Sequence, residues 1–241
     1  MKSPLKSFCL ISIMFLIIGV LPEASPDMTF VYQETTSTGG RTRGPSPLTT
    51  YITSTRMRTE TSTSKITIID LEKMKLFNLD SKTKKCYVEN IRDLAAQTKS
   101  LPAALSQLEP KITVTNETSQ IEGYKCTKII VNVGIMKQTV WVSPKIKTDK
   151  VLFEFNKKQA ELLKDVPFIS SQNALWQQYQ KMQSFPVKIV IETKTPHFTS
   201  RTESILKSYN YDKIDPALFE IPKGYTPLPK QPQPSLPFLS W

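Results

Sequence analysis

The sequence is poor in the residues that most often carry catalysis and metal binding. It contains one histidine and three cysteines in 241 residues. His197 stands in "TPHFTS", a predicted hairpin turn, and no G-x-S-x-G motif is present to supply the serine of a Ser-His-acid triad. P-loop, G-x-G-x-x-G and H-E-x-x-H motifs are absent too. We therefore expect a protein that is not an enzyme and needs neither a metal nor another cofactor, although two carboxylates brought together by the fold stay an open alternative.

Long hydrophobic runs are also scarce, and the single one lies at the start of the chain. Lys2 and Lys6 precede an apolar run from Phe8 to Leu21, and the small residue Ala24 follows it. This is the layout of a secretory signal peptide over residues 1–24, cleaved near Ala24. The run is shorter than the roughly 20 residues of a spanning helix, and an uncleaved anchor is the alternative. We expect a periplasmic or secreted protein.

Removal of this segment leaves two cysteines, Cys86 and Cys126. In an oxidising compartment an even pair favours a disulfide. Two buried free thiols are the alternative. Neither cysteine belongs to a Cys-x-x-Cys motif, which argues against redox catalysis and zinc binding.

Basic residues outnumber acidic ones, and the formal net charge is +11. The lysines are scattered in pairs such as Lys84 and Lys85, with acidic residues between the pairs. This pattern is typical of a solvated surface, so we expect no nucleic-acid binding. The anionic neighbour of an exported protein would be a membrane surface or an acidic lipid headgroup.

Apolar residues recur every second position over much of the chain, which predicts strands. "KITIIDLEKMKLFNLDSKTKKCYVENI", residues 65–91, reads as a three-stranded meander, and residues 28–35 as a strand. Residues 36–47, with Arg41 and Arg43, read as a mobile loop. Further strands are predicted in "KITVTNET", "YKCTKIIVNVG" and "KQTVWVSP", and a closing hairpin surrounds His197.

Two regions carry helical signals. Residues 91–108 have leucines on one helical face, and "NALWQQYQKMQS" places Leu175 and Tyr179 on one face. Asn156 and Gln159 have the spacing of a capping box before "AELLKD". The order of strands and helices predicts an α+β fold with a curved antiparallel sheet. We expect one monomeric domain over residues 25–228 and a disordered proline-rich tail over 229–241.

Several stretches together resemble a known family. They are "RMRTE", the meander, "IEGYKCTKIIVNVG", "TVWVSP", "FPVKIVIET" with "TSRTESIL", and "DPALFEIPKGY". In order and spacing they are similar to an exported family known only as a domain of unknown function, which is similar in fold to the LolA and LolB lipoprotein carriers. The resemblance covers almost the whole mature chain. It implies an unclosed half-barrel whose concave face is covered by helices as a lid.

A half-barrel of this kind implies an apolar cleft suited to lipid tails. The expected lining residues are Ile68, Leu76, Phe77, Val140, Leu175, Trp176, Tyr179, Ile189 and Ile191. Taken singly, each is better interpreted as an ordinary core residue.

Two functions follow as hypotheses. The first is a non-enzymatic envelope protein that binds a lipid or another apolar ligand in the cleft. The second is an envelope interaction or sensor protein with a packed core, which binds a protein partner through its surface. The size of the cavity inside the half-barrel distinguishes them, because ligand sites typically measure roughly 300 to 1,000 Å³.

Overall fold

The computed structural model describes residues 27–93, 110–146, 150–163, 167–195 and 197–228. The predicted signal peptide, most of the helix predicted over 91–108 and the proline-rich tail lie outside these ranges. Among the described residues, no helix has both the length and the apolar character needed to cross a membrane.

The described residues are mostly strands. The elements are β1 (Met28–Thr38), β2 (Arg41–Ile52), β3 (Arg56–Thr61), β4 (Lys65–Asp70), β5 (Lys75–Asp80), β6 (Lys85–Asn90), β7 (Lys111–Ile121), β8 (Tyr124–Val133), β9 (Met136–Ser143), α3 (Lys150–Leu162), α4 (Pro167–Lys181), β10 (Phe185–Thr195), β11 (Phe198–Asn210), a 3₁₀ turn η1 (Pro216–Phe219) and β12 (Thr226–Leu228). The fold is therefore mostly β with few helices, rather than the balanced α+β arrangement predicted from the sequence.

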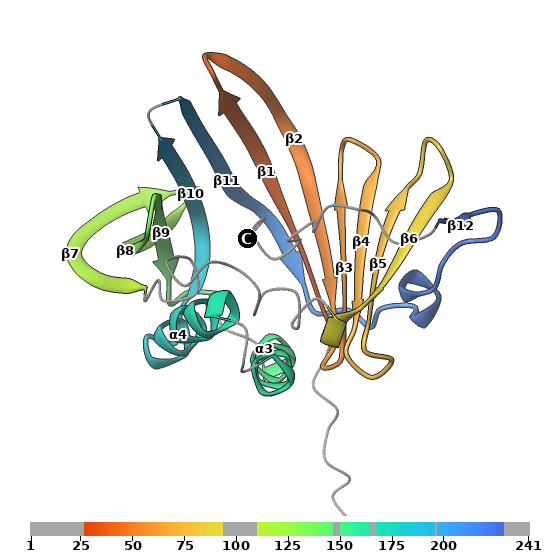
Figure 1. The fold of residues 1–241 in the computed structure, drawn as a ribbon. Coiled ribbons are helices and arrows are strands. Elements are labelled where there is room, and N and C mark those ends of the chain that lie inside the picture. The colour runs from red at the N-terminus through yellow and green to blue at the C-terminus, as the bar shows by residue number, and fades with distance from the viewer. Residues whose placement is uncertain (1–26, 94–109, 147–149, 164–166, 196, 229–241) are drawn as a thin grey trace, which may run out of the picture.

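One curved sheet organises the molecule. Its twelve strands follow the order β12-β6-β5-β4-β3-β2-β1-β11-β10-β9-β8-β7, and all pairs are antiparallel except β12 with β6. The sheet bends around α3 and α4 without closing, and its two edges are β12 and β7 (Figure 1). The predicted meander is confirmed as β4, β5 and β6, and the predicted closing hairpin as β10 and β11.

The segment predicted as a mobile loop is instead the end of a long hairpin. β1 and β2 pair up to Thr38 and Arg41, with a turn at Gly39 and Gly40. Both glycines have positive φ, 54° and 80°, as a tight two-residue hairpin turn requires. The prediction was wrong because the small polar residues looked like loop chemistry, whereas they pair across strands: the Ser37 and Thr42 hydroxyls lie 2.9 Å apart.

The helix start predicted at Asn156 was also wrong. α3 begins at Lys150, so Asn156 lies in its second turn rather than at its N-terminus. The Asn156 side chain donates from Nδ2 to the carbonyl oxygen of Leu152, 2.8 Å away. A side-chain bond to the preceding turn therefore replaces the predicted capping box.

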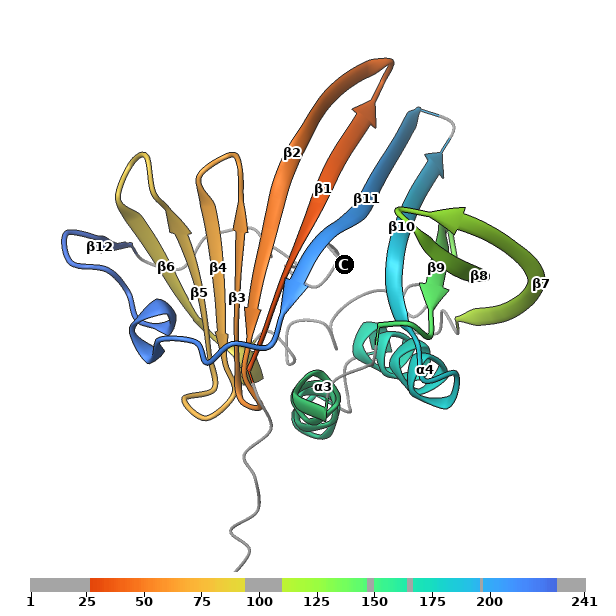
Figure 2. The same ribbon diagram turned by 180° about the vertical axis from the view of Figure 1, so that it is seen from behind.

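The sheet buries both of its faces over the β3–β6 half. The face that carries Phe30, Tyr32 and Leu206, called the inner face below, packs against Leu152 and Phe155 of α3. The opposite, outer face of β4 to β6 is covered by the C-terminal segment from Ile214 to Tyr225. Figure 2 shows this segment crossing the back of the sheet, away from the helices.

The predicted disulfide between Cys86 and Cys126 is not formed. Both cysteines are free and buried. Cys86 lies on the outer face of β6, and Cys126 lies on β8, near the opposite edge of the sheet. The even count of cysteines carried no information on distance, and the alternative of two buried thiols is what the structure contains.

Candidate functional site

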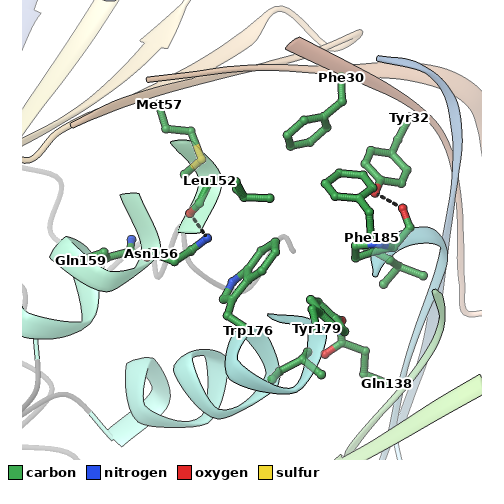
Figure 3. Close-up of a pocket in the computed structure, with 13 residues that line it drawn as sticks. Phe30, Tyr32, Met57, Gln138, Leu152, Asn156, Gln159, Trp176, Tyr179 and Phe185 are labelled. Carbon is green, nitrogen blue, oxygen red and sulfur yellow. Dashed lines mark hydrogen bonds between the residues drawn. The ribbon is translucent and has the colours of Figure 1, made fainter. Parts of the chain in front are cut away.

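A small cavity lies between the inner face and the two helices (Figure 3). Its volume is about 70 Å³. It is lined by Phe30, Tyr32, Met57, Gln138, Leu152, Asn156, Gln159, Leu175, Trp176, Tyr179, Phe185, Pro186 and Ile189. None of these lining side chains is charged, so the cavity suits an uncharged chemical group.

Aromatic rings from β1 and β10, two strands that are far apart in the sequence, form the wall of the cavity on the sheet side. The Phe30 ring meets those of Tyr32 and Phe185 edge to face, at centroid distances of 5.7 and 5.6 Å. The Tyr32 hydroxyl donates to the carbonyl oxygen of Pro186 over 2.7 Å. Burial raises the pKa of Tyr32 well above its ordinary value, so this phenol stays neutral.

The wall on the helix side comes from α4. Leu175 and Tyr179 are buried one turn apart and pack on β8 and β9. Trp176 is half-buried and meets the Tyr179 ring edge to face at 5.2 Å. Its indole points into the middle of the space between α3, α4 and the sheet (Figure 3). The helical face predicted from the sequence is thus confirmed.

Three amide side chains interrupt the apolar lining. Asn156 and Gln159 come from α3 and are half-buried. Gln138 comes from β9, and only 4% of it is exposed.

A larger groove adjoins the cavity on the outside of the helices. It measures about 550 Å³ and runs between α3 and α4. Its lining residues are Phe153, Asn156, Lys157, Ala160, Glu161, Asn173, Trp176, Gln177 and Gln180. Asn156 and Trp176 line both spaces. These two side chains therefore stand between the inner cavity and solvent.

The structure brings together only part of the predicted lining. Leu175, Trp176, Tyr179 and Ile189 line the cavity. Ile191 lies two residues beyond Ile189 on the same face and is half-buried.

The other predicted residues lie elsewhere. Ile68 and Phe77 belong to the cluster on the outer face, beneath the C-terminal segment. Leu76 and Val140 are fully buried core residues that do not reach the cavity. Neighbouring residues such as Leu76 and Phe77 cannot share one face of a strand, because side chains alternate.

Sequence reasoning missed the aromatic wall. Phe30 and Tyr32 stand two residues apart in "MTFVYQ", a stretch correctly predicted as a strand. Because side chains alternate along a strand, the sequence contained the signal that Phe30 and Tyr32 share one face. Nothing in the sequence placed these two residues opposite Phe185 and Trp176.

Metal ligands are not clustered in the described part of the chain. No three His, Cys, Asp or Glu side chains come close enough there to hold an ion. The expectation that the protein uses no metal stays a prediction.

Comparisons with known proteins identify a family and related folds. The family described as domain of unknown function DUF4412 matches residues 36–225. Among solved structures, the chain is similar to an uncharacterized conserved protein from Thermus thermophilus, at 10% identity and a TM-score of 0.46, covering 86% of this chain and 91% of that one.

Two further structures are similar at lower scores. A DUF1329 family protein from Desulfovibrio piger is 11% identical, with a TM-score of 0.35 and coverage of 81% of this chain and 90% of that one. A LolA superfamily protein from Nitrosomonas europaea is 6% identical, with a TM-score of 0.33 and coverage of 83% and 91%. A search of curated proteins found no match.

The family match spans most of the chain and includes the outer end of the long hairpin, the meander, both helices and the C-terminal segment. The resemblance to a family known only as a domain of unknown function is confirmed by this match. The chain belongs to the DUF4412 family.

Proposed function

We propose that this protein is an exported, non-enzymatic envelope protein that binds an apolar chain, such as the acyl chain of a lipid, between the inner face and the helices α3 and α4. One observation carries the proposal: an uncharged, largely apolar cavity is separated from a solvent-facing groove only by Trp176 and Asn156. An interior meant solely as core would be filled by side chains to close packing.

The cavity as it stands is too small for such a ligand. Its volume of about 70 Å³ compares with roughly 300 Å³ or more for ordinary ligand sites. Binding therefore requires α3 and α4 to move apart, or Trp176 to swing toward the outer groove of about 550 Å³. The helices serve as a lid in this proposal, and the structure corresponds to its closed state.

A packed-core interaction protein is the second candidate. The same small volume favours it, because an interior that stays closed offers no room for a ligand. The two candidates differ in one measurable respect, which is whether a neutral apolar probe binds in a saturable manner.

A substitution that fills the cavity provides the test. Ile189→Phe adds a ring to a side chain that lines the cavity. Ile112→Phe adds the same ring on the edge strand β7, where Ile112 is half-buried and does not line the cavity. The probe is 1-N-phenylnaphthylamine, a neutral apolar dye whose fluorescence rises when it leaves water.

We expect one-to-one binding by the wild-type protein, about tenfold weaker binding by Ile189→Phe, and unchanged binding by Ile112→Phe. Unfolding curves of all three proteins check that they fold. Absence of saturable binding, together with an unliganded mass in native mass spectrometry of protein from its own exporting compartment, would overturn the proposal in favour of the packed-core candidate.

A further inference from the structure

A third hollow lies on the sheet, at the end of the β1–β2 hairpin. It measures about 350 Å³ and is lined by Thr36, Thr38, Arg41 and Arg43. The hairpin extends past the helices, so this hollow stands apart from the cavity beneath α3 and α4 (Figure 1). The proposed function does not involve this hollow.

The strand register places this hollow on the inner face. Along β1, Thr36 and Thr38 follow Tyr32 at even spacing, so their side chains share the face that lines the cavity. Arg43 is the cross-strand partner of Thr36, and Arg41 that of Thr38. Directly paired residues point to the same side of an antiparallel sheet.

Polarity changes in steps along this face. Residues that are paired side by side across the strands form rows on this face. The row nearest the helices is apolar, and in it Tyr32 is paired with Leu48 and Leu206. The next row outward contains Glu34 and Ser204. Beyond it lies a row of five residues paired across five strands, which are Gln138, Ile191, Thr202, Thr36 and Arg43. The outermost row ends at Arg41 and is otherwise mainly hydroxyl-bearing. The inner face is therefore amphipathic from its helical end to its open end.

The two arginines are free to receive an anion. Both are exposed, and neither forms an ion pair with another described residue. Arg201, on the opposite face of the neighbouring strands, shows the usual arrangement, because it pairs with Glu192 at 3.0 Å and Glu203 at 2.7 Å. Two guanidinium groups beside threonine hydroxyls offer the planar donors that carboxylates and phosphates accept.

Two other residues agree with an amphiphilic ligand. Gln138, in the same row as Arg43, is nearly buried and contributes a polar amide to the lining of the cavity. Glu34 accepts a hydrogen bond from Ser204 at 3.4 Å, one row nearer the helices. A carboxylate at that depth disfavours an anion beside it, which leaves the arginine rows as the place for a negative headgroup.

We propose that the ligand is an anionic amphiphile, whose chain lies in the cavity beneath the helices and whose headgroup binds Arg41 and Arg43. This inference rests on the proposed function. The separation fits, because Thr36 lies four residues from Tyr32, or about 13 Å along the strand. Both a fatty acid carboxylate and a lipid phosphate share the chemistry of this headgroup.

The test compares three probes with one tail. Hexadecanol, hexadecanoate and hexadecyl phosphate displace 1-N-phenylnaphthylamine from the wild-type protein, from Arg41→Gln/Arg43→Gln, and from Lys82→Gln/Lys85→Gln. The last variant is the control, because it also removes two exposed positive charges, on the β5–β6 turn and the start of β6. Circular dichroism checks that both double variants fold.

We expect the two anionic probes to bind the wild-type protein and the lysine control about tenfold more tightly than hexadecanol. The arginine variant should lose this preference and keep its affinity for hexadecanol. Preference for the phosphate over the carboxylate would assign the headgroup to a phospholipid, and the reverse preference to a fatty acid.

Equal binding of hexadecanol and the anions, or a preference that survives in the arginine variant, would overturn this inference while the proposed function stands. Failure of all three probes to bind would overturn both.

Discussion

At the scale of single residues, backbone geometry constrains the β1–β2 hairpin at Gly44. This glycine has φ of 100°. A Cβ atom there would lie 2.5 Å from the carbonyl oxygen of Glu34 and 3.2 Å from Cα of Thr35. Both atoms belong to the backbone of the paired strand, so neither can move aside without disturbing the hairpin.

We predict that Gly44→Ala destabilises the protein by about 2 kcal/mol or more, through a strained φ and the steric overlap. Gly40→Ala is the matched control, because φ is 80° there but no atom lies within 4 Å of the added Cβ. Urea unfolding measures both free energies. Equal losses in the two variants would show that close approach to Glu34 has no effect.

Glu34 is a second residue whose surroundings have a measurable consequence. Burial raises the pKa of its carboxyl group, and the hydrogen bond from Ser204 opposes this only partly. A raised pKa means that folding disfavours the ionised form. The stability cost is absent below the ordinary value of 4.5 and is present once the pH exceeds the folded-state pKa.

Glu34→Gln should therefore raise the melting temperature at pH 7, and the difference from wild type should disappear near pH 4. Glu72→Gln, an exposed residue on the β4–β5 turn, is the control and should show no such pH-dependent gain. Thermal unfolding at the two pH values checks this. A gain of equal size at both would refute the assignment to ionisation.

At the scale of elements, the C-terminal segment is fastened to the outer face by arginines of β3. The Arg58 Nη1 donates to the carbonyl oxygen of Leu218 at 2.7 Å, and the Arg56 guanidinium lies 4.9 Å from the centre of the Phe219 ring. Phe219 itself is 1% exposed and packs on Ile68 and Phe77. This segment explains why the meander has apolar residues on both faces.

We predict that Phe219→Ala destabilises the protein by about 3 to 5 kcal/mol, because it empties a buried site of a large side chain. Ile221→Ala removes a neighbouring side chain that is 37% exposed and should cost within about 0.5 kcal/mol. Chemical denaturation of both variants measures the difference. A small loss for Phe219→Ala would mean that the segment contributes little to the fold.

At the scale of the whole molecule, one pairing joins the first described strand to a strand late in the chain. β1 pairs with β11, so that Thr29 lies opposite Asn210 and Thr38 opposite Ser200. The meander and the β7–β11 strands thereby become a single curved sheet. That curvature creates an inner face, on which the apolar cavity and the arginine rows lie along the same strands.

The same arrangement separates the two cysteines across nearly the full width of the sheet. We predict that the mature protein, purified without reductant, has the mass of a dithiol, with no loss of the two hydrogens that a disulfide would remove. Intact mass spectrometry with and without reductant measures this. Two masses that differ by those hydrogens would require a fold in which Cys86 and Cys126 meet.

Part of the fold and of the candidate site could be predicted from the sequence, because that part depends on residues that are close together along the chain. The period of two predicted most of the strands, and the period of the α4 helix predicted the face of Leu175 and Tyr179. Where a run was apolar on both sides, as in "KITIID", the period could not decide which isoleucine faces inward. Ile68 was assigned to the wrong face for this reason.

The sequence by itself determined most of the strands, where the meander turns and which family the chain resembles, since these follow from local spacing and order. Only the tertiary structure decided that Phe30, Phe185 and Trp176 meet around one cavity. It also decided that Arg41 and Arg43 stand on the same face. The contact between Phe30 and Phe185 joins residues more than 100 positions apart, and a contact of this kind depends on the register of strands and the curvature of the sheet. Neither quantity is written in the composition or period of any single segment.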